Sequence, residues 1–326
     1  MRHRNVKMWA AAALLGVTLP LCAQLGVGIA LNRRSFMCYE HIYACVTLRN
    51  DSGRPLMFGN RPELQGFVLF DIRDQNDRPV RRASDREIGV AGLYLAPGEL
   101  KRMVIPLDRY YDLTKPGKYR VYAYVSHNML PREFRSKDAA FTVNEGLQVW
   151  KRTVGLPGST GDGAPDGGDR IYSISELDEG GHRSYYLKVE DPERILAVTR
   201  VGNMVGYEKF HAEVDMMSRI HLLMPVSPRI FHYMSFNVNG TCLASTYWKT
   251  SGSIPMLYRD EKSGKVTRIG GEEAQKGVDY RDPKEGRLTI REILEDQKGE
   301  TPEAPRDEGV LDLGEHVLPH KAADEK

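Results

Sequence analysis

A histidine- and acid-rich segment is the part of this chain whose residue types could support acid–base or metal chemistry. His211, Glu213 and Asp215 alternate along it, and His221 and His232 follow soon after. Imidazole and carboxylate groups act as bases or ligands only when they converge in space, and spacing alone does not show convergence. Ordinary surface and sheet histidines are the simpler interpretation. We therefore predict no catalytic residue, no metal site and no cofactor.

Aromatic residues in the same region offer a second chemistry, the stacking of flat rings on sugars. Phe231, Tyr233 and Trp248 are expected on one face of a hairpin, and exposed aromatic faces usually mark binding. We predict these three as ligand-binding residues. The alternative is that they belong to a sheet core, and the burial of Trp248 would then remove the platform.

Familiar catalytic motifs are missing from the sequence. It contains no Gly-x-Ser-x-Gly elbow, no His-Glu-x-x-His pair, no P-loop and no dinucleotide fingerprint. The Gly- and Asp-rich stretch 158–169 invites a calcium-loop interpretation, but its spacing fails the EF-hand pattern. A solvated loop is favoured there.

The elements that would position these residues are strands. Asn239-Gly240 is the preferred pair for a two-residue type I′ turn, which predicts a hairpin over 231–248. The cross-strand pairs that this turn predicts are Phe231–Trp248, His232–Tyr247, Tyr233–Thr246, Phe236–Leu243, Asn237–Cys242 and Val238–Thr241. Further strands are expected at 147–150, 183–190, 195–201, 220–224, 254–259 and 266–269. Residues 146–271 are thus predicted to form an antiparallel β domain of hairpins, either a sheet or a small sandwich.

The preceding part of the chain is organised around one strand and its turn. After Lys115-Pro116-Gly117-Lys118, the residues Tyr119, Val121, Ala123 and Val125 share a face, which is the period of a half-buried strand. Other short strands alternate with Gly/Pro/Asn/Asp turns, a pattern typical of a β-sandwich. Leu113, the Pro-Gly turn and Tyr119 match a tyrosine corner, in which the phenol bonds to backbone near Leu113.

These turns carry a resemblance. In order along the chain they are Asn50–Leu56, Asp71–Pro79, Leu95–Glu99 and Pro116–Tyr119. The stretch of about residues 40–125 resembles immunoglobulin-like and fibronectin-type modules of secreted bacterial proteins, and is similar to the sandwich of BsuPI-type proteinase inhibitors. The resemblance implies an immunoglobulin-like sandwich over 24–145. It rests on turns and core positions, so it implies a fold and transfers no inhibitory loop.

The N-terminus predicts export. A basic start to Lys7, an apolar run from Met8 to Leu21 and a small residue at Ala23 are typical of a secretory signal peptide over 1–23. An uncleaved anchor and a lipoprotein at Cys22 are the alternatives. We expect a bacterial periplasmic or secreted protein with no transmembrane helix in the mature chain.

Cleavage after Ala23 would leave three cysteines, Cys38, Cys45 and Cys242. An odd number in an oxidising compartment leaves one thiol unpaired. Cys38 and Cys45 could bridge only if the chain turns near Glu40.

The C-terminal part differs in composition. Residues 271–326 hold 16 acidic and 9 basic residues, whereas the whole chain has a net charge of +2. We expect an acidic tail over 272–326 with one short helix near 289–297 and disorder beyond it. No basic cluster is dense enough to predict nucleic-acid binding.

Together the residues predict an all-β protein: an immunoglobulin-like sandwich, a second antiparallel β domain and a charged tail. The leading functional hypothesis is an exported non-enzymatic protein that binds an envelope protein or polysaccharide, or has a structural role there. One alternative is an enzyme, or enzyme accessory, acting on polysaccharide or protein, with a site near His211, Asp215 and His232. The other is a peptidase inhibitor, prompted by the sandwich resemblance.

Overall fold

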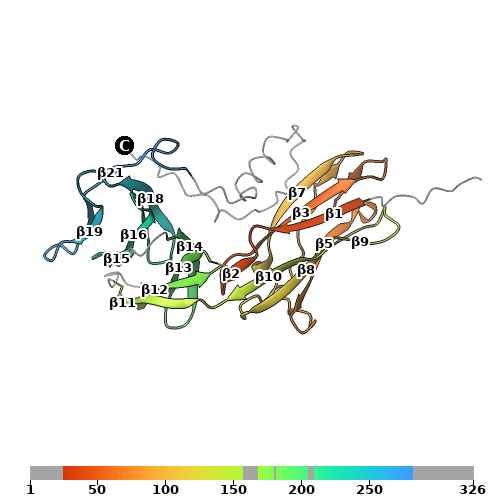
Figure 1. Cartoon of the computed structure of the whole chain (residues 1–326). Coiled ribbons are helices and arrows are strands. Elements are labelled where there is room, and N and C mark those ends of the chain that lie inside the picture. Colours follow the sequence, from red (N-terminus) through yellow and green to blue (C-terminus); the bar gives the residue numbers. More distant parts are fainter. Residues whose placement is uncertain (1–24, 157–167, 180, 205–208, 282–326) are drawn as a thin grey trace, which may run out of the picture.

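The chain is built almost entirely from strands. The computed structural model describes residues 25–156, 168–179, 181–204 and 209–281. Within them the only helices are two short 3₁₀ turns, Pro62–Leu64 and Leu107–Arg109. Two β units with separate hydrophobic cores follow one another along the chain (Figure 1). The predicted all-β fold with several antiparallel sheets is confirmed.

The first unit is a sandwich of two sheets with a short extra ribbon. One sheet has the order β1-β3-β7, the other has the order β2-β10-β8-β5 with β9 added to β8, and the ribbon pairs β4 with β6. Only β10 and β2 pair in parallel. The strands are β1 (Leu25–Leu31), β2 (Ser35–Met37), β3 (Tyr43–Asn50), β4 (Leu56–Met57), β5 (Gly66–Asp74), β6 (Tyr94–Leu95), β7 (Leu100–Pro106), β8 (Gly117–His127), β9 (Phe134–Arg135) and β10 (Ala139–Asn144).

Strand β8 shows the alternation that the sequence predicts. Its buried residues are Tyr119, Val121, Ala123, Val125 and His127. The Tyr119 hydroxyl donates a hydrogen bond to the Lys115 carbonyl at 2.7 Å, and its ring stacks on Phe141 with 5.3 Å between ring centres. We expected the acceptor near Leu113, whereas it lies in the turn directly before the strand. Tyr119 therefore ties that turn to the core.

The second unit consists of two facing sheets and an outer hairpin. The sheets have the orders β11-β12-β13-β14 and β15-β16-β17-β18-β21, and the hairpin pairs β19 with β20. The strands are β11 (Leu147–Gly155), β12 (Asp169–Asp178), β13 (Arg183–Glu190), β14 (Ile195–Asn203), β15 (His211–Val214), β16 (Ile220–Ser227), β17 (Ile230–Phe236), β18 (Cys242–Lys249), β19 (Met256–Arg259), β20 (Val266–Ile269) and β21 (Glu272–Glu273). Strand β12 was not among the expected elements.

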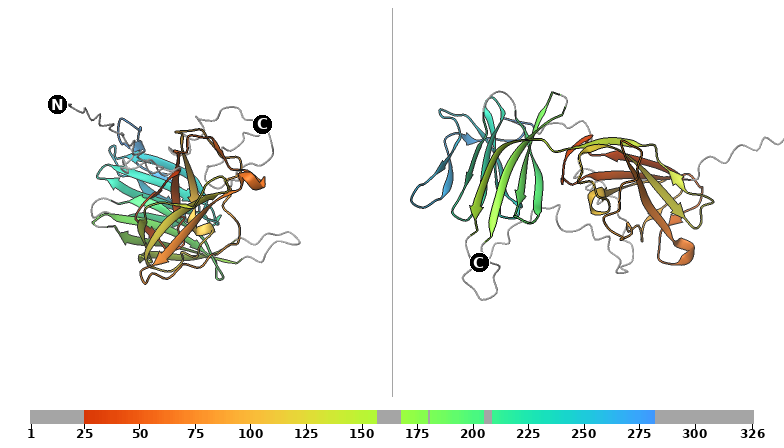
Figure 2. Two further views of the ribbon diagram at one scale, coloured as in Figure 1. Left: turned by 90° about the vertical axis from the view of Figure 1, so that its right-hand side faces the viewer. Right: turned by 90° about the horizontal axis from the view of Figure 1, so that it is seen from below.

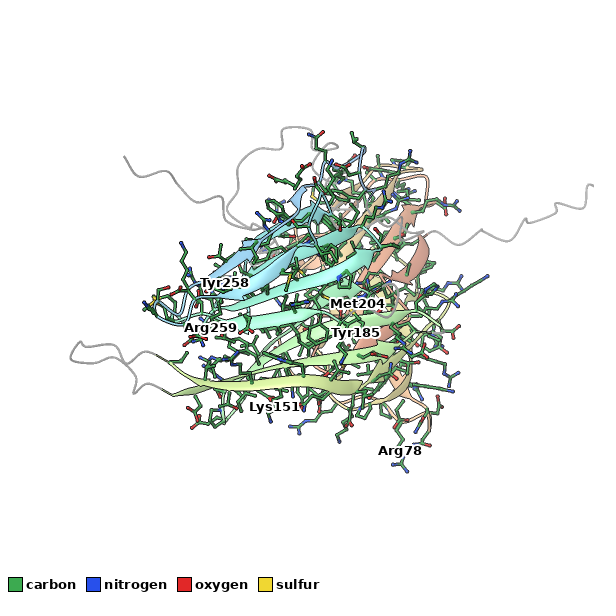
Figure 3. All side chains as sticks on the ribbon, turned by 60° about the vertical axis from the view of Figure 1, so that its left-hand side comes forward. Arg78, Lys151, Tyr185, Met204, Tyr258 and Arg259 are labelled. Carbon is green, nitrogen blue, oxygen red and sulfur yellow. The ribbon has the colours of Figure 1, made fainter. Side chains whose placement is uncertain are left out.

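The two sheets of the second unit enclose a common core. Tyr172, Tyr185 and Leu187 from one sheet meet Leu222 and Phe236 from the other. Figure 3 shows Tyr185 between the layers and Tyr258 on the outer hairpin. Of the two predicted alternatives, a small sandwich is the one observed. The right-hand view of Figure 2 shows the two units following one another along the long axis of the molecule.

The hairpin of β17 and β18 has the predicted register away from its turn, but a different turn. Phe231 lies opposite Trp248, whereas Phe236 pairs with Cys242 instead of Leu243. The Asn237 carbonyl accepts the Gly240 N–H, and the Asn237 N–H donates to the Thr241 carbonyl. Of the loop residues, only Gly240 has a positive φ, at 83°, so this is a three-residue loop and not a type I′ turn. A bulge at Leu243 restores the register.

Cys38, Cys45 and Cys242 are free thiols. The chain does turn at Tyr39, where φ is 67°, yet no disulfide joins Cys38 to Cys45. No helix among the described residues is long and apolar enough to cross a membrane. The predicted signal peptide, most of the Gly/Asp-rich loop and the predicted C-terminal helix lie outside the described residues. The domain boundaries proposed from the sequence stay predictions.

Candidate functional site

The predicted aromatic residues lie on the outward face of the β15-β16-β17-β18-β21 sheet. Met234 and Phe236 of β17 point into the core of the second unit, so Phe231 and Tyr233, at the alternate positions, point away from it. Trp248 is on the same face because it pairs with Phe231. The predicted shared face is therefore present.

This aromatic face is covered by the chain itself. The guanidinium carbon of Arg268, from β20, lies 3.2 Å from the centre of the Trp248 ring, a cation–π contact in the position that a stacked sugar would need. Phe231 is only 5% exposed. We correct the expectation of an open three-ring platform, because Phe231 is enclosed and Arg268 covers Trp248. Ligand binding by these residues stays a prediction.

A chain of hydrogen bonds links Asp215, His221 and Tyr233 on the same face. One Asp215 carboxylate oxygen accepts the backbone N–H groups of Met217 and Arg219, both at 2.9 Å. The other oxygen contacts His221 Nε2 at 3.2 Å and accepts from Arg219 Nε at 2.8 Å. His221 Nδ1 lies 2.8 Å from the Tyr233 hydroxyl. The turn after β15 thus holds the acid against the histidine.

Burial sets the electrostatics of these three groups. It lowers the pKa of His221, although Asp215 opposes that shift, and it raises the pKa of the Tyr233 phenol. Burial alone would raise the pKa of Asp215, but bonds from Arg219 and His221 bring it below its ordinary value. His221 is only 7% exposed. An acid–histidine–hydroxyl chain has the form of an activated nucleophile, but an enclosed histidine and a phenol that keeps its proton suit a structural network.

The remaining histidines of the predicted cluster do not join this network. His232 pairs with Tyr247 and points to the inner side of the sheet, opposite to His221. Its ring stacks on Tyr247 at 4.2 Å, and burial lowers its pKa to about 4. His211 is exposed at the start of β15. The hypothesis of one site near His211, Asp215 and His232 is wrong. Asp215 contacts His221 on the outward face of the sheet, whereas His232 points to the inner side. The described residues hold no group of three metal-binding side chains.

The first unit contains a groove that the sequence did not indicate. Its floor is the outward face of the β1-β3-β7 sheet, since Ala44, Val46 and Leu48 of β3 point into the core. Cys45 and Thr47 occupy the alternate positions. The other floor residues come from the flanking strands, and the register aligns them: Ala30, Arg102 and Val104. Tyr43 of β3 also lines this face, and the small side chains of Ala30, Cys45 and Thr47 leave it hollow, with a cavity volume of about 720 Å³.

The walls of the groove are mostly polar. The polar lining residues beyond the floor are Asn32, Arg33, Arg34 and Asp138. Together with Arg102 on the floor, the groove has three arginines against one aspartate. The signal in the sequence was the alternation of Gly26, Gly28 and Ala30 along β1, which leaves that strand without large outward side chains.

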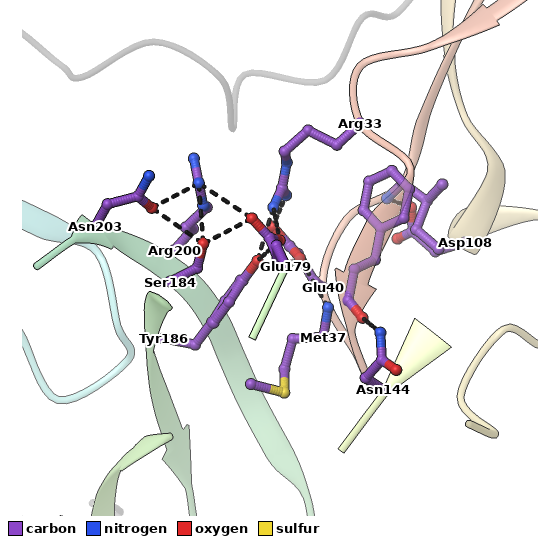
Figure 4. A network of polar contacts seen from close by, with 12 residues as sticks. Arg33, Met37, Glu40, Asp108, Asn144, Glu179, Ser184, Tyr186, Arg200 and Asn203 are labelled. Carbon is purple, nitrogen blue, oxygen red and sulfur yellow. Dashed lines mark hydrogen bonds and ion pairs between the residues drawn. The ribbon is translucent and has the colours of Figure 1, made fainter. Parts of the chain in front are cut away.

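Arg33, which lines the groove, also connects the two units through the polar contacts drawn in Figure 4. Arg33 forms an ion pair with Glu40 and donates a 2.7 Å hydrogen bond to the Tyr186 hydroxyl of β13. Tyr186 in turn donates to Glu179 at 3.2 Å. Met37 packs beside this network against apolar residues of the second unit. The groove is therefore next to the inter-unit contact.

The short linker between the units requires a glycine. Gly146 separates β10 from β11 and has a φ of 72°, which other residues rarely adopt. A Cβ there would lie 2.6 Å from the Met37 side chain. The end of the Met37 side chain could move aside, but the same Cβ would also lie 3.0 Å from the Glu176 carbonyl oxygen, so the positive φ and this backbone contact favour glycine at position 146.

Comparison with known proteins gives little guidance. No protein-family model matches the chain, and no curated protein matches it. Among solved structures, one neighbour is a family 123 glycoside hydrolase from Clostridium perfringens, studied for glycolipid glycan hydrolysis, with 13% identity and a TM-score of 0.25. The match covers 37% of this chain and 27% of that enzyme. At that TM-score it carries no argument about fold or activity.

Proposed function

We propose that this chain is an exported, non-enzymatic binding protein of the cell envelope, and that the groove of the first unit holds its partner. The groove is the observation that carries this proposal. Its volume of about 720 Å³ lies in the range of roughly 300–1,000 Å³ that is usual for ligand sites. Its guanidinium groups suit carboxylates or phosphates. The expected partner is an envelope protein or polysaccharide that carries anionic groups.

The second unit supports the non-enzymatic part of this proposal. In its acid–histidine–phenol network Asp215 and His221 are buried and Tyr233 is half-buried, and His232 lies on the other side of the sheet. General acids and bases must reach the proton that they transfer. The network around Asp215 instead satisfies buried polar groups beneath the outer hairpin.

Export and an immunoglobulin-like first module belong to the same proposal. The basic and apolar N-terminal segment supports export. The two-sheet sandwich and the Tyr119–Lys115 hydrogen bond support the module. The intact mass of the protein recovered from the periplasm or culture fluid tests export. Cleavage after Ala23 is expected, and recovery of the unprocessed chain in the cytoplasm alone would contradict it.

Filling the groove tests the binding function. Thr47→Trp would place a large ring on the groove floor, whereas Trp248→Ala alters the aromatic face of the second unit. Each mature protein is immobilised and exposed to envelope extract and to a glycan array. We expect wild type and Trp248→Ala to retain a common partner that Thr47→Trp loses by about tenfold or more, equivalent to about 1.4 kcal/mol. Equal retention by all three proteins would contradict a groove-bound partner.

A further inference from the structure

The groove has a chemistry that its occupant must match. Arg33 is already paired with Glu40, but the lining also holds Arg34 and Arg102 against the single carboxylate of Asp138, so the occupant should carry negative charge. Cys45, Val104 and the alanines give it an apolar floor. The side-chain oxygen of Asn32 is buried, and no hydrogen-bond donor reaches it among the described residues. Because an unsatisfied buried acceptor is costly, the occupant should also bring an N–H or O–H donor to Asn32.

A segment of this chain has those properties. Residues 282–326, which follow the described part, contain 13 acidic and 7 basic residues, a net charge of −6. Acidic and apolar residues are interspersed in it, and its backbone amides are donors. Residues 288–296 are one such stretch, with the apolar Leu288, Ile290, Ile293 and Leu294, the acidic Glu292, Glu295 and Asp296, and the basic Arg291.

The length of the segment permits the contact. Its 45 residues span up to about 150 Å when extended, at roughly 3.3 Å per residue. Covalent attachment to the same chain also gives the segment an effective concentration in the mM range. Even a weak interaction, with a Kd of about 0.1 mM, would then be about tenfold in favour of the bound state.

We propose that the acidic segment 282–326 docks in the basic groove of its own chain. The proposal rests on the proposed function in that it assigns an occupant to the same groove. The segment would then compete with an external partner, so that the partner must displace it. Binding of an anionic partner would become a choice between two acidic ligands for the same arginines.

Thiol alkylation of the full mature chain tests this docking. Cys45 lines the groove, Cys242 is exposed in the second unit, and Cys38 is buried. The alkylation rate of Cys45 relative to that of Cys242, followed by peptide mass spectrometry, reports cover over the groove. Cys38 reports unfolding, because it should stay unreactive in every folded variant.

Two sets of changes should open the groove. Neutralising the segment with Glu292→Gln, Glu295→Gln and Asp296→Asn, or reversing the groove charge with Arg34→Glu and Arg102→Glu, should each raise the relative rate of Cys45 about tenfold. Salt near 1 M, where the Debye length is about 3 Å, should do the same in the wild type. Arg54→Glu, an exposed arginine outside the groove, should leave the rate unchanged.

A relative rate that salt and both sets of changes leave unaltered would overturn the docking. That failure differs from failure of the proposed function. Loss of partner capture in Thr47→Trp would still support a binding groove without an internal occupant. Conversely, protection of Cys45 without any captured partner would support the docking and contradict the binding function.

Discussion

The outward faces of two sheets differ in the opposite sense to what their residue types suggest: the face with reactive residues is covered, and the face with fewer of them is open. The β15-β16-β17-β18-β21 face has the aromatic, histidine and acidic residues, but Arg268 covers Trp248 and Asp215 is enclosed. The β1-β3-β7 face has small residues and is open as a groove. Reactive-looking side chains can thus satisfy one another, whereas a binding cavity needs space. The first face is expected to contribute stability and the second to contribute binding.

The largest effect on stability should come from Asp215. Its side chain is 3% exposed and takes part in four hydrogen bonds. Asp215→Ala should lower the free energy of unfolding by about 3 kcal/mol, since it strands buried donors. Asp215→Asn, which keeps an acceptor for the turn, should cost less. Urea unfolding measures both. If Asp215→Ala left the stability unchanged or increased it, the network would be retained for activity, and the contrast between a structural face and a binding face would be wrong.

Acid should weaken the second unit through His232. The folded pKa is about 4, below the unfolded value of about 6.5, so protons bind the unfolded state preferentially between these values. The stability that depends on a neutral His232 is therefore fully present above pH 6.5 and is lost as the pH falls toward 4. From pH 7 to about 4.5, wild type should lose about 2 kcal/mol more than His232→Phe. Equal acid losses in urea titrations would show that His232 is not desolvated.

Removing Arg268 should uncover the aromatic face at a modest cost. Arg268→Ala should lower the free energy of unfolding by about 1 kcal/mol, the usual size of a cation–π contact, and increase acrylamide quenching of tryptophan fluorescence. Arg259→Ala, on the neighbouring strand of the hairpin, is the matched control. If Arg268→Ala also created carbohydrate binding on a glycan array, the covered platform would prove to be a latent site.

The smallest effect on stability should come from the groove. Thr47 is a half-buried residue on the outward face, so Thr47→Trp should change the free energy of unfolding by no more than about 0.5 kcal/mol. Chemical denaturation measures it. A loss of several kcal/mol would mean that the groove floor is packed and that both faces are structural.

Local patterns predicted much of the fold. The alternation of β8 identified its buried face because period two is independent of the neighbours. The predicted pairing of Phe231 with Trp248 was also correct, although the predicted turn was wrong. The three-residue loop shifts the pairing by one residue, and the bulge at Leu243 shifts it back. Strand β12 was missed because its first residues follow a Gly/Asp-rich stretch, and polar Ser173 and Ser175 interrupt the apolar run.

The site could be predicted less well, because it depends on contacts between distant segments. Asp215 contacts His221 because its carboxylate accepts hydrogen bonds from the backbone of the turn between them. The alternation of side chains along β17 places His232 on the opposite face of the sheet. Arg268 comes from a hairpin whose docking on Trp248 has no local signature. The groove arises because the small side chains of Ala30, Cys45 and Thr47 lie close together, and it becomes visible only when the register aligns β1 with β3.

The dissociation constant of the captured partner is the most direct test of the central claim, that binding belongs to the groove of the first unit. It would be measured for wild type, Thr47→Trp and Trp248→Ala. A groove site predicts weakening of about tenfold or more for Thr47→Trp, with Trp248→Ala within about twofold of wild type. The opposite order, with Trp248→Ala impaired and Thr47→Trp normal, would contradict the account and return the site to the aromatic face.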